Sequence, residues 1–409
     1  MKTQTMLRWP VLITLWLMSN ALAYGATDDS ISSASHLSQL INTRLGYMKD
    51  VAAYKWINNI AIEDLRREQK VIAAAQSSGL QSHLTMESSR LFFTLQIEAA
   101  KEIQRYWFKQ WQEGPAPDKA PDLVNEVRPR LIELGNDIVQ ALALQQTSDR
   151  PSIGITGLSP ETANQLEAAA GSVKFYPNQL DQILSSKNLR VGTTLDYAPF
   201  SYERAGQPTG IDLDLARDLA LSLDAELILV NTSWPTLMAD LAAGKFDIGM
   251  SGISINLERQ KSAYFSLPHH TGGKTAIVRC DQLSRFDDLT KIDQPETRVI
   301  VNPGGTNQRF IQSNVERAAI TVHSDNRTIF DEIIENRADV MITDAIEVEL
   351  QSALHSELCG AMPGQTFTFQ QKGFLLPRDQ VWKQFVDTWL TQRTGESVVK
   401  QAFTRHLSN

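Results

Sequence analysis

The chain has 409 residues, more than one hydrophobic core usually serves, so two or more domains are expected. Its composition is that of an ordinary soluble protein, and its formal net charge at pH 7 is −8. The absence of a concentrated basic stripe argues against nucleic acid and against an anionic membrane surface as partners. Small molecules therefore remain as the expected ligands.

The N-terminal residues have the three parts of a secretory signal peptide. Lys2 and Arg8 precede a short apolar run at 11–18, and small residues at 21–23 suit a cleavage site. A transmembrane anchor is the alternative, but the run is far shorter than the roughly 20 residues that a spanning helix needs. We expect a signal peptide at 1–23, export to the periplasm, and no membrane contact after cleavage.

The two cysteines of the chain are Cys280 and Cys359. Two thiols cannot make a structural zinc site, and an exported chain resides where disulfides persist. Buried free cysteines are the alternative, because free cysteine is common in protein cores. We expect the disulfide, and we expect no metal site.

Two kinds of hydrophobic periodicity divide the chain. Between Leu37 and Leu144 apolar residues recur at intervals of three and four, which predicts an all-helical first part. From Leu189 onward, short β-rich runs alternate with helical stretches, which predicts α/β domains with largely parallel sheets. The clearest of these runs are 189–192, 227–230, 247–250 and 298–301.

Two polar segments that contain proline and glycine, 145–155 and 171–178, are candidate linkers. The segment between them begins with Ser159-Pro160, a typical helix start, so we assign it to the helical part. The boundary is placed near Tyr176. The expected organisation is a multidomain chain with a signal peptide at 1–23, an all-helical domain at 24–175 and an α/β domain at 176–409.

Helical geometry brings charged residues of the first domain together. Arg44 and Lys55 are eleven residues apart, close to three turns of about 3.6 residues each, so we expect them on one face of one helix. Asp64 and Arg67, three residues apart on the next helix, would add a guanidinium that a carboxylate orients. Taken alone, such pairs are more often a solvated helix face than a binding site.

The local sequence around these residues favours a binding site. Five groups of residues occur in the order and approximate spacing found in secreted, all-helical chorismate mutases. They are Arg44-Leu45, 51–56, 62–64 with Arg67, Gln96-Ile97 with Gln104, and 121–123 with Arg128. The domain resembles that family over most of 24–173. The resemblance implies a unimolecular rearrangement of chorismate to prephenate that needs no cofactor, and a homodimer through the helical domain.

The resemblance also assigns roles to individual residues. Chorismate carries two carboxylates, and its rearrangement needs only geometry and charge, so arginines can clamp the carboxylates while donors stabilise the ether oxygen. The carboxylate clamps would be Arg44, Arg67 and Arg128, the ether donors Lys55 and Gln104, and Asp64 would orient ring contacts or the Arg67 head group.

Two positions depart from the family pattern. Ala100 stands where relatives often have a small hydroxyl residue, so one hydrogen bond to a substrate carboxylate is missing or comes from elsewhere. Around Arg128 the alignment needs a one-residue shift, which makes Arg130 an alternative.

The second domain resembles the periplasmic amino-acid-binding proteins over nearly all of 179–409. The motifs that carry this resemblance are 189–194, 197–202, 210–214, 247–254 with Glu258-Arg259, 304–306, and 338–339 leading to Thr343-Asp344. It implies two α/β lobes joined by a hinge, with the ligand between them and an inserted second lobe at roughly 278–374.

In that fold Arg259 would clamp a ligand carboxylate, assisted by donors near Ser254 and Thr306. Asp344 would accept a ligand ammonium. The same features fit a solute receptor that delivers an amino acid to a transporter, because fold does not specify function.

Four further segments, 232–235, 256–260, 302–307 and 343–347, are similar to the periplasmic cyclohexadienyl dehydratases. These enzymes use the binding-protein scaffold catalytically. The resemblance implies that Glu347 is the general acid that protonates the ring hydroxyl of prephenate, which leaves as water with decarboxylation. Burial and a neighbouring carboxylate would keep this acid protonated.

The remaining contacts of the second site follow from the same resemblance. Trp234 and Asn307 would contact the ring and its hydroxyl, and Arg259 with Thr306 would hold the side-chain carboxylate. Lys274 is the candidate for the ring carboxylate. From the residues alone, a tryptophan is often core and a glutamate is often a surface acid.

The fusion of the two domains favours an enzyme. A mutase makes prephenate and the second domain resembles a prephenate consumer, so the reactions are consecutive. Because Asp344 offers a partner for the ammonium of arogenate, we also expect conversion of arogenate to phenylalanine. The alternatives are a chorismate mutase fused to a non-catalytic amino-acid-binding domain, and an exported sensor or interaction protein in which both domains have lost activity.

Overall fold

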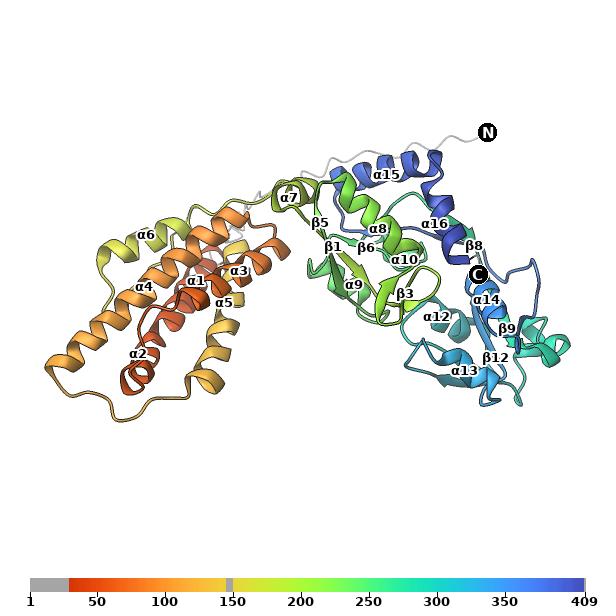
Figure 1. The fold of residues 1–409 in the computed structure, drawn as a ribbon, viewed down its shortest axis with the longest axis horizontal. Coiled ribbons are helices and arrows are strands. Elements are labelled where there is room, and N and C mark those ends of the chain that lie inside the picture. The colour runs from red at the N-terminus through yellow and green to blue at the C-terminus, as the bar shows by residue number, and fades with distance from the viewer. Residues whose placement is uncertain (1–28, 145–149, 408–409) are drawn as a thin grey trace, which may run out of the picture.

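The computed structural model describes residues 29–144 and 150–407, with side chains from residue 34 onward. The expected signal peptide at 1–23 lies outside these ranges. Within them, no helix combines the length and the apolar character needed to cross a membrane. Figure 1 shows a helical body, coloured red to yellow, and an α/β body, coloured green to blue, which meet beside α7 (Gln179–Ser186).

The helical body confirms the all-helical expectation. Its core is built from apolar residues at intervals of three and four, such as Leu37, Ile41 and Leu45, which are fully buried. The Thr85 and Ser159 hydroxyls accept backbone N–H groups and cap the fourth and sixth helices. The elements are α1 (Asp29–Gly46), α2 (Met48–Ile57), α3 (Leu65–Gln81), α4 (Met86–Glu113), the short π-helix η1 (Leu123–Val127), α5 (Arg128–Ala143) and α6 (Pro160–Ala170).

The helix expected to carry both Arg44 and Lys55 is two helices. The run is interrupted at Tyr47, so Arg44 lies in the last turn of α1 and Lys55 in the last turn of α2. The Val51 backbone N–H still donates to the Tyr47 carbonyl at 3.0 Å, so the helical path continues through the interruption. The single-helix expectation is wrong, but both side chains line the same cavity.

The α/β body alternates strands and helices as its sequence predicts, and four β-rich runs recognised in the sequence correspond to β1, β5, β6 and β10. Its first part holds β1 (Asn188–Thr193), β2 (Asp196–Tyr197), β3 (Ser201–Arg204), β4 (Gln207–Thr209), α8 (Ile211–Ser222), β5 (Glu226–Asn231), α9 (Leu237–Ala242), β6 (Ile248–Gly249), α10 (Leu257–Gln260), β7 (Tyr264–Phe265) and β8 (His270–Gly272).

The chain then crosses to a second lobe and returns. This part holds β9 (Lys274–Arg279), the 3-10 helix η2 (Cys280–Arg285), α11 (Leu289–Ile292), β10 (Arg298–Val301), α12 (Thr306–Asn314), β11 (Ala319–Val322), α13 (Ile329–Ile334), β12 (Val340–Asp344), α14 (Ala345–Leu354) and β13 (Leu358–Gly360). The return comprises β14 (Gln370–Lys372), β15 (Leu375–Leu376), α15 (Gln380–Gly395) and α16 (Val398–Leu407).

Two five-stranded sheets form the centres of the lobes. The first has the order β5-β1-β6-β15-β7, in which β1 pairs in parallel with β5 and β6. The second has the order β11-β10-β12-β9-β13, in which β10 pairs in parallel with β11 and β12. Strand β9 already belongs to the second sheet and begins at Lys274, ahead of residue 278, where the sequence suggested that the lobe starts.

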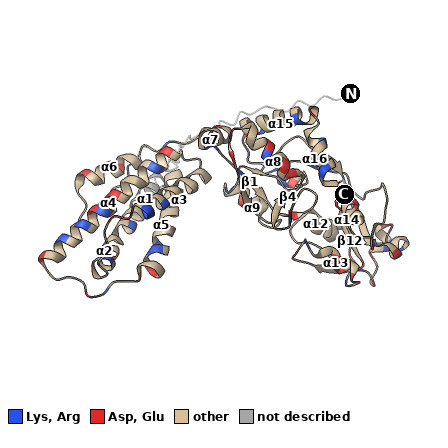
Figure 2. Ribbon diagram, in the orientation of Figure 1, with Lys and Arg blue, Asp and Glu red and all other residues tan. Residues whose placement is uncertain are grey.

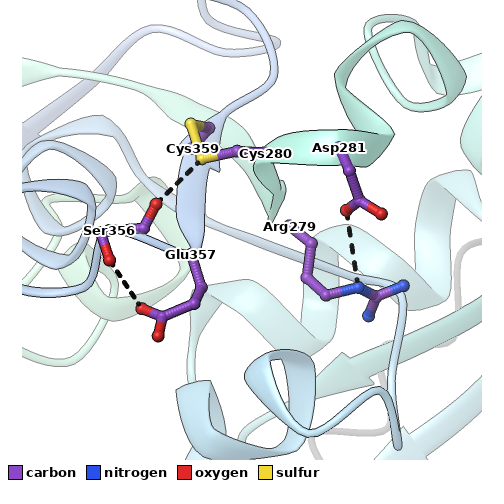
Figure 3. The surroundings of a disulfide bond; sticks show 6 residues. All are labelled: Arg279, Cys280, Asp281, Ser356, Glu357 and Cys359. Atoms are coloured by element: carbon purple, nitrogen blue, oxygen red, sulfur yellow. Dashed lines mark hydrogen bonds and ion pairs between the residues drawn. A yellow bond between two sulfur atoms is a disulfide. The ribbon is translucent and has the colours of Figure 1, made fainter.

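Cys280 and Cys359 form a disulfide in the second lobe (Figure 3). Cys280 follows β9 directly and Cys359 lies in β13, and these two strands are antiparallel neighbours. The bond therefore ties the edge of the second sheet to the strand beside it. Ser356, whose carbonyl lies 3.5 Å from the Cys280 sulfur, belongs to the turn before β13.

The junction between the bodies is hydrogen-bonded. Residue Tyr176 donates its backbone N–H to the His83 carbonyl at 2.8 Å, and its hydroxyl accepts the Met86 N–H at 3.2 Å. On the other side, the positive φ of Gly244 lets its backbone lie against the Gln81 carbonyl, so closely that a Cβ there would be 2.3 Å from that oxygen. The loop between α3 and α4 therefore packs on the first lobe of the α/β body.

Candidate active sites

The helical body contains a cavity of about 290 Å³ between its helices. The side chains come from α1 to α5, and the cavity unites all six residues that the resemblance assigned to the mutase. Those six are Arg44, Lys55, Asp64, Arg67, Gln104 and Arg128. Arg130, the alternative to Arg128, is exposed and pairs with Glu133 at 2.5 Å, so it does not belong to this lining.

Arg44 is the most deeply placed cation of the cavity. Its side chain donates to Gln96 Oε1 at 2.5 Å, and its buried Nε has no hydrogen-bond partner among the described residues. Burial lowers the pKa of Arg44 to about 10, so the guanidinium keeps its charge at neutral pH. A buried cation bonded only to an amide is a strong site for a ligand carboxylate, because a charged acceptor would complete its hydrogen bonds.

Lys55 and Gln104 present donors to the same space. Lys55 Nζ donates to the Ile62 carbonyl at 2.6 Å, which fixes the ammonium at the cavity wall. Burial lowers the pKa of Lys55. Gln104 Nε2 donates to the Ala100 carbonyl at 3.0 Å, and its second hydrogen faces only the weak acceptor Met48 Sδ at 3.8 Å. A substrate oxygen would be a better acceptor for that hydrogen than the thioether.

Asp64 lies at the start of α3 and caps that helix. Its carboxylate accepts the backbone N–H of Arg67 at 3.1 Å, and no hydrogen bond to the Arg67 guanidinium is seen among the described residues. Asp64 is exposed at the cavity rim, and Arg67 is half-buried there.

Glu68 and Lys101 form an ion pair in the lining of the cavity that the sequence analysis did not predict. Lys101 is 8% exposed and pairs with Glu98 at 2.7 Å and Glu68 at 3.4 Å. Burial acts to lower the pKa of Lys101, but the two carboxylates outweigh it and raise that pKa. The position of Glu68, four residues after Asp64 on the same helix face, was the available signal. Lys101 follows Ala100, so a cation lies beside the position that lacks a hydroxyl.

A second cavity lies between the lobes of the α/β body and measures only about 20 Å³. That volume is close to the space of a single water molecule, so the lobes are closed over it. Its lining includes seven residues expected from the sequence, which are Trp234, Ser254, Arg259, Thr306, Asn307, Asp344 and Glu347. Tyr197, Asn302, Asn326 and Lys372 also line it and were not among the expected site residues.

Glu347 is 2% exposed and lies in the first turn of α14. Burial raises the pKa of Glu347 to about 8, and the Asp344 charge acts in the same direction. The Thr343 hydroxyl donates to Glu347 Oε2 at 2.5 Å and opposes the shift. The carboxyl group is therefore mostly protonated at neutral pH, and a buried carboxylic acid at a cavity can serve as a proton donor.

A chain of hydrogen bonds fixes which oxygen of Glu347 carries the proton. Lys274 Nζ donates to Asn307 Oδ1, so the Asn307 amide nitrogen points to Thr343 Oγ1 at 3.1 Å. Because Thr343 accepts from Asn307, its own hydrogen goes to Glu347 Oε2. The proton of Glu347 then belongs on Oε1, the oxygen that these hydrogen bonds leave free for a substrate.

Asp344, the expected partner of a ligand ammonium, is surrounded by donors of the chain itself. Its Oδ1 lies 3.3 Å from Lys274 Nζ, and its Oδ2 lies 2.5 Å from Lys372 Nζ and accepts the Tyr197 hydroxyl. Burial acts to raise the pKa of Asp344, but the two lysines and Tyr197 hold it well below its ordinary value. Both carboxylate oxygens are therefore already paired within the chain.

Arg259 supplies the remaining cation of this cavity. Its guanidinium donates to the Ser254 carbonyl at 3.1 Å, and its buried Nε has no partner among the described residues. Burial lowers the pKa of Arg259 to about 10, so it stays charged at neutral pH. Trp234 donates its indole N–H to Asp196 at 3.2 Å, and its ring meets the Tyr197 ring edge-on at 5.8 Å. An aromatic wall therefore faces the cations.

Charged residues of both signs are spread over both bodies in Figure 2. The two cavities share no lining residue. Each cavity is therefore formed within one body, with cations suited to carboxylates in both and a protonated acid in the second.

Comparison with known proteins finds a different family in each of the two bodies. Residues 189–407 match the model of the bacterial extracellular solute-binding proteins, family 3, and residues 35–105 match chorismate mutase type II. The cyclohexadienyl dehydratase of Pseudomonas aeruginosa is 54% identical over 234 residues, which are 57% of this chain and 87% of that protein. The secreted chorismate mutase of Yersinia pestis is 38% identical over 113 residues, 28% of this chain and 61% of that protein.

A solved structure supports the two-lobed fold. The crystal structure of an ancestral amino acid-binding protein, a precursor of cyclohexadienyl dehydratase, has 32% sequence identity and a TM-score of 0.53. The match covers 56% of this chain and 99% of the ancestral one. Because the first family match spans more than half of the residues, the chain belongs to the bacterial extracellular solute-binding proteins of family 3, with a chorismate mutase type II segment ahead of that domain.

Proposed function

We propose that this chain is a bifunctional enzyme that converts chorismate to prephenate in its helical domain and prephenate to phenylpyruvate in its two-lobed domain, with arogenate to phenylalanine as a parallel reaction. The observation that carries the second activity is the buried, protonated Glu347 in a cavity lined by cations. A receptor for amino acids needs carboxylate and ammonium partners, but it has no use for a proton donor. The 54% identity with a cyclohexadienyl dehydratase supports the same conclusion.

In the helical domain the cavity performs a rearrangement without proton transfer or a covalent intermediate. Arg44, Arg67 and Arg128 would hold the two carboxylates of chorismate so that the enolpyruvyl side chain lies over the ring. Lys55 and Gln104 would donate to the ether oxygen, whose negative charge grows as its bond to the ring breaks. Because the donors are already fixed by Ile62 and Ala100, little reorganisation is needed during the reaction.

In the two-lobed domain Glu347 would transfer its Oε1 proton to the ring hydroxyl of prephenate. The C–O bond then breaks and water leaves, while the C–C bond to the ring carboxylate breaks and releases carbon dioxide. The electron pair from that C–C bond completes the aromatic ring. Prephenate dianion and one proton thus give phenylpyruvate, carbon dioxide and water, and solvent restores the proton to Glu347.

The cations have unequal tasks in this reaction. A cation on the departing carboxylate would stabilise the reactant more than the transition state, because the charge leaves that group as carbon dioxide forms. Arg259 is therefore better used on the side-chain carboxylate, which keeps its charge throughout. We propose this role for Arg259 with Ser254 and Thr306, and a weaker contact of Lys274 with the ring carboxylate.

Entry of substrate requires the lobes to separate, because about 20 Å³ cannot hold prephenate. Contacts that join the lobes in the closed form include Tyr197 with Asp344, and the Asn326 amide with the Asp196 carbonyl at 2.9 Å. Closure around a bound molecule would exclude water from Glu347 and keep its pKa high.

The resemblance to exported proteins supports a proposal about where the two reactions take place. We propose export by the signal peptide at 1–23 and residence in the periplasm, with a boundary near Tyr176 and an inserted second lobe at roughly 278–374. A homodimer through the helical domain remains part of the same proposal, and its test is the molar mass of the purified protein in solution.

A coupled assay tests both activities at once. Chorismate added to the mature protein should yield phenylpyruvate, and the Glu347→Gln variant should stop at prephenate. Accumulation of prephenate in the wild type would reject the dehydratase activity. Undiminished phenylpyruvate formation by Glu347→Gln would keep the activity but reject this residue as its acid. The Glu396→Gln variant, which changes an exposed glutamate of the same domain, is the matched control.

A further inference from the structure

Lys372 is a buried cation of the second cavity for which no motif provided a role. It lies at the end of β14, in the segment that returns from the second lobe, and it is 4% exposed. Its ammonium donates to Asp344 Oδ2 at 2.5 Å and to Ser254 Oγ at 3.0 Å, and lies 5.1 Å from the centre of the Tyr197 ring. Both hydrogen-bond partners of its ammonium, Asp344 and Ser254, line the second cavity.

Ser254 connects this ammonium to the proposed carboxylate clamp. Its carbonyl accepts from Arg259 at 3.1 Å, and its hydroxyl accepts from Lys372 at 3.0 Å. A carboxylate held by Arg259 thus lies next to Lys372. In both prephenate and arogenate, the carbon attached to that carboxylate carries the only group that distinguishes the two molecules, a keto oxygen or an ammonium.

The keto oxygen and the ammonium need opposite partners. A keto oxygen accepts hydrogen bonds, so it needs a donor such as Lys372, whereas an ammonium donates and needs an acceptor such as Asp344. The structure contains this donor and this acceptor as one bonded pair, 2.5 Å apart. An incoming ammonium must displace Lys372 from Asp344, but an incoming keto oxygen need not.

We propose that Lys372 is the specificity-determining residue of the dehydratase site. It donates a hydrogen bond to the α-keto oxygen of prephenate and competes with the α-ammonium of arogenate for Asp344. This inference rests on the proposed function of the same site.

The charges of the cavity support this assignment. Arg259 and Lys372 line the cavity as cations, and Lys274, which is not part of the lining, is bonded to the lining residues Asp344 and Asn307. With Asp344 as an anion and Glu347 neutral, these groups carry two net positive charges. Prephenate, with two carboxylates and no ammonium, balances them. Arogenate carries one further positive charge, so the closed cavity with arogenate bound has one uncompensated positive charge unless Lys372 is removed.

The decisive experiment compares kcat/KM for prephenate and arogenate in the wild type and in Lys372→Met. The variant should raise the ratio of arogenate to prephenate by at least about tenfold, the size of one charge-assisted hydrogen bond. Asp344 keeps Lys274 and Tyr197 as partners in this variant, so the cavity retains part of its network. Lys400→Met, a change at an exposed lysine on α16, is the matched control and should leave the ratio unchanged.

A second measurement does not depend on turnover. Phenylpyruvate and phenylalanine differ at the same position as the substrates, so their dissociation constants should shift in opposite directions in Lys372→Met, with phenylpyruvate weaker and phenylalanine tighter. Lys372→Gln, which keeps a donor without the charge, should lie between the wild type and the methionine variant, and it provides the test if the latter does not fold.

The outcomes separate the two hypotheses. A ratio and a pair of dissociation constants that both stay within about twofold of the wild type would overturn the role of Lys372, even if the dehydratase is active. A wild type that binds both products but turns over neither substrate would reject the proposed function, while opposite shifts of the two constants would still support the reading of the α-group.

Discussion

Ionisation of Glu347 offers the sharpest test of the dehydratase mechanism. Burial raises the pKa of this carboxyl group from 4.5 to about 8. At about 1.4 kcal/mol for each pH unit, this difference means that ionising Glu347 in the closed cavity costs about 5 kcal/mol more than ionising it in water. At pH 7 roughly nine in ten molecules should hold the proton, against roughly one in 300 for a glutamate with the ordinary pKa of 4.5.

The pH dependence of turnover follows from this value. Since only protonated Glu347 can donate, kcat for prephenate should be level below pH 7 and fall about tenfold per pH unit above pH 8. The assay is phenylpyruvate formation between pH 6 and 10, with the acid-catalysed background measured without protein. A decline centred near pH 4 to 5, or no decline up to pH 10, would refute the assignment of Glu347 as a buried general acid.

Stability provides an independent readout with a defined sign. The folded-state pKa of Glu347 is raised, so below pH 4.5 both folded and unfolded chains hold the proton and the group has no effect. Between pH 4.5 and 8 the unfolded chain loses the proton first, which destabilises the fold increasingly. The unfolding free energy of Glu347→Gln should therefore rise relative to the wild type across that window, by up to about 5 kcal/mol. A constant difference between the two proteins would contradict the raised pKa.

Three further outcomes are expected. Thr343→Val removes the donor to Glu347 Oε2, so the alkaline decline of kcat should move above that of the wild type while kcat falls, and Thr343→Ser should restore both. Lys55→Ala should abolish chorismate consumption and leave prephenate turnover intact in separate assays, because the cavities share no residue. Replacement of Cys280 and Cys359 by serine should lower the unfolding free energy of the second lobe by roughly 2–4 kcal/mol, measured by urea titration, because the bond closes a long loop.

The sequence predicted most of the architecture because the relevant signals are local. The intervals of three and four that begin at Leu37 and the β-rich run at 298–301 depend on a residue and its near neighbours. The interruption at Tyr47 was not predictable in this way. An apolar pattern passes through it without a proline or a change of phase, so no local signal marks the change from α1 to α2.

The candidate sites were predicted where a motif marks the residue and missed where only the fold does. Arg259 and Glu347 stand in segments that resemble known families, and both line the expected cavity. Lys372 comes from a strand that returns from the far lobe and meets Asp344, 28 positions earlier in the chain, only after folding. For the same reason the sequence did not show that Asp344 is paired with Lys372.

The attachment of the helical domain determines which part of the dehydratase can move. Gln81 packs against Gly244, and Tyr176 bonds to His83, so the α3–α4 loop and the linker hold the mutase to the first lobe. The second lobe meets the first at the small cavity, through contacts such as Tyr197 with Asp344 that lie beside the substrate space. We therefore expect opening to move the second lobe, with Glu347 and Asp344, away from Arg259 and from the helical domain. On this expectation the mutase cavity stays undisturbed when prephenate enters the second site, because the joint between the two domains does not change.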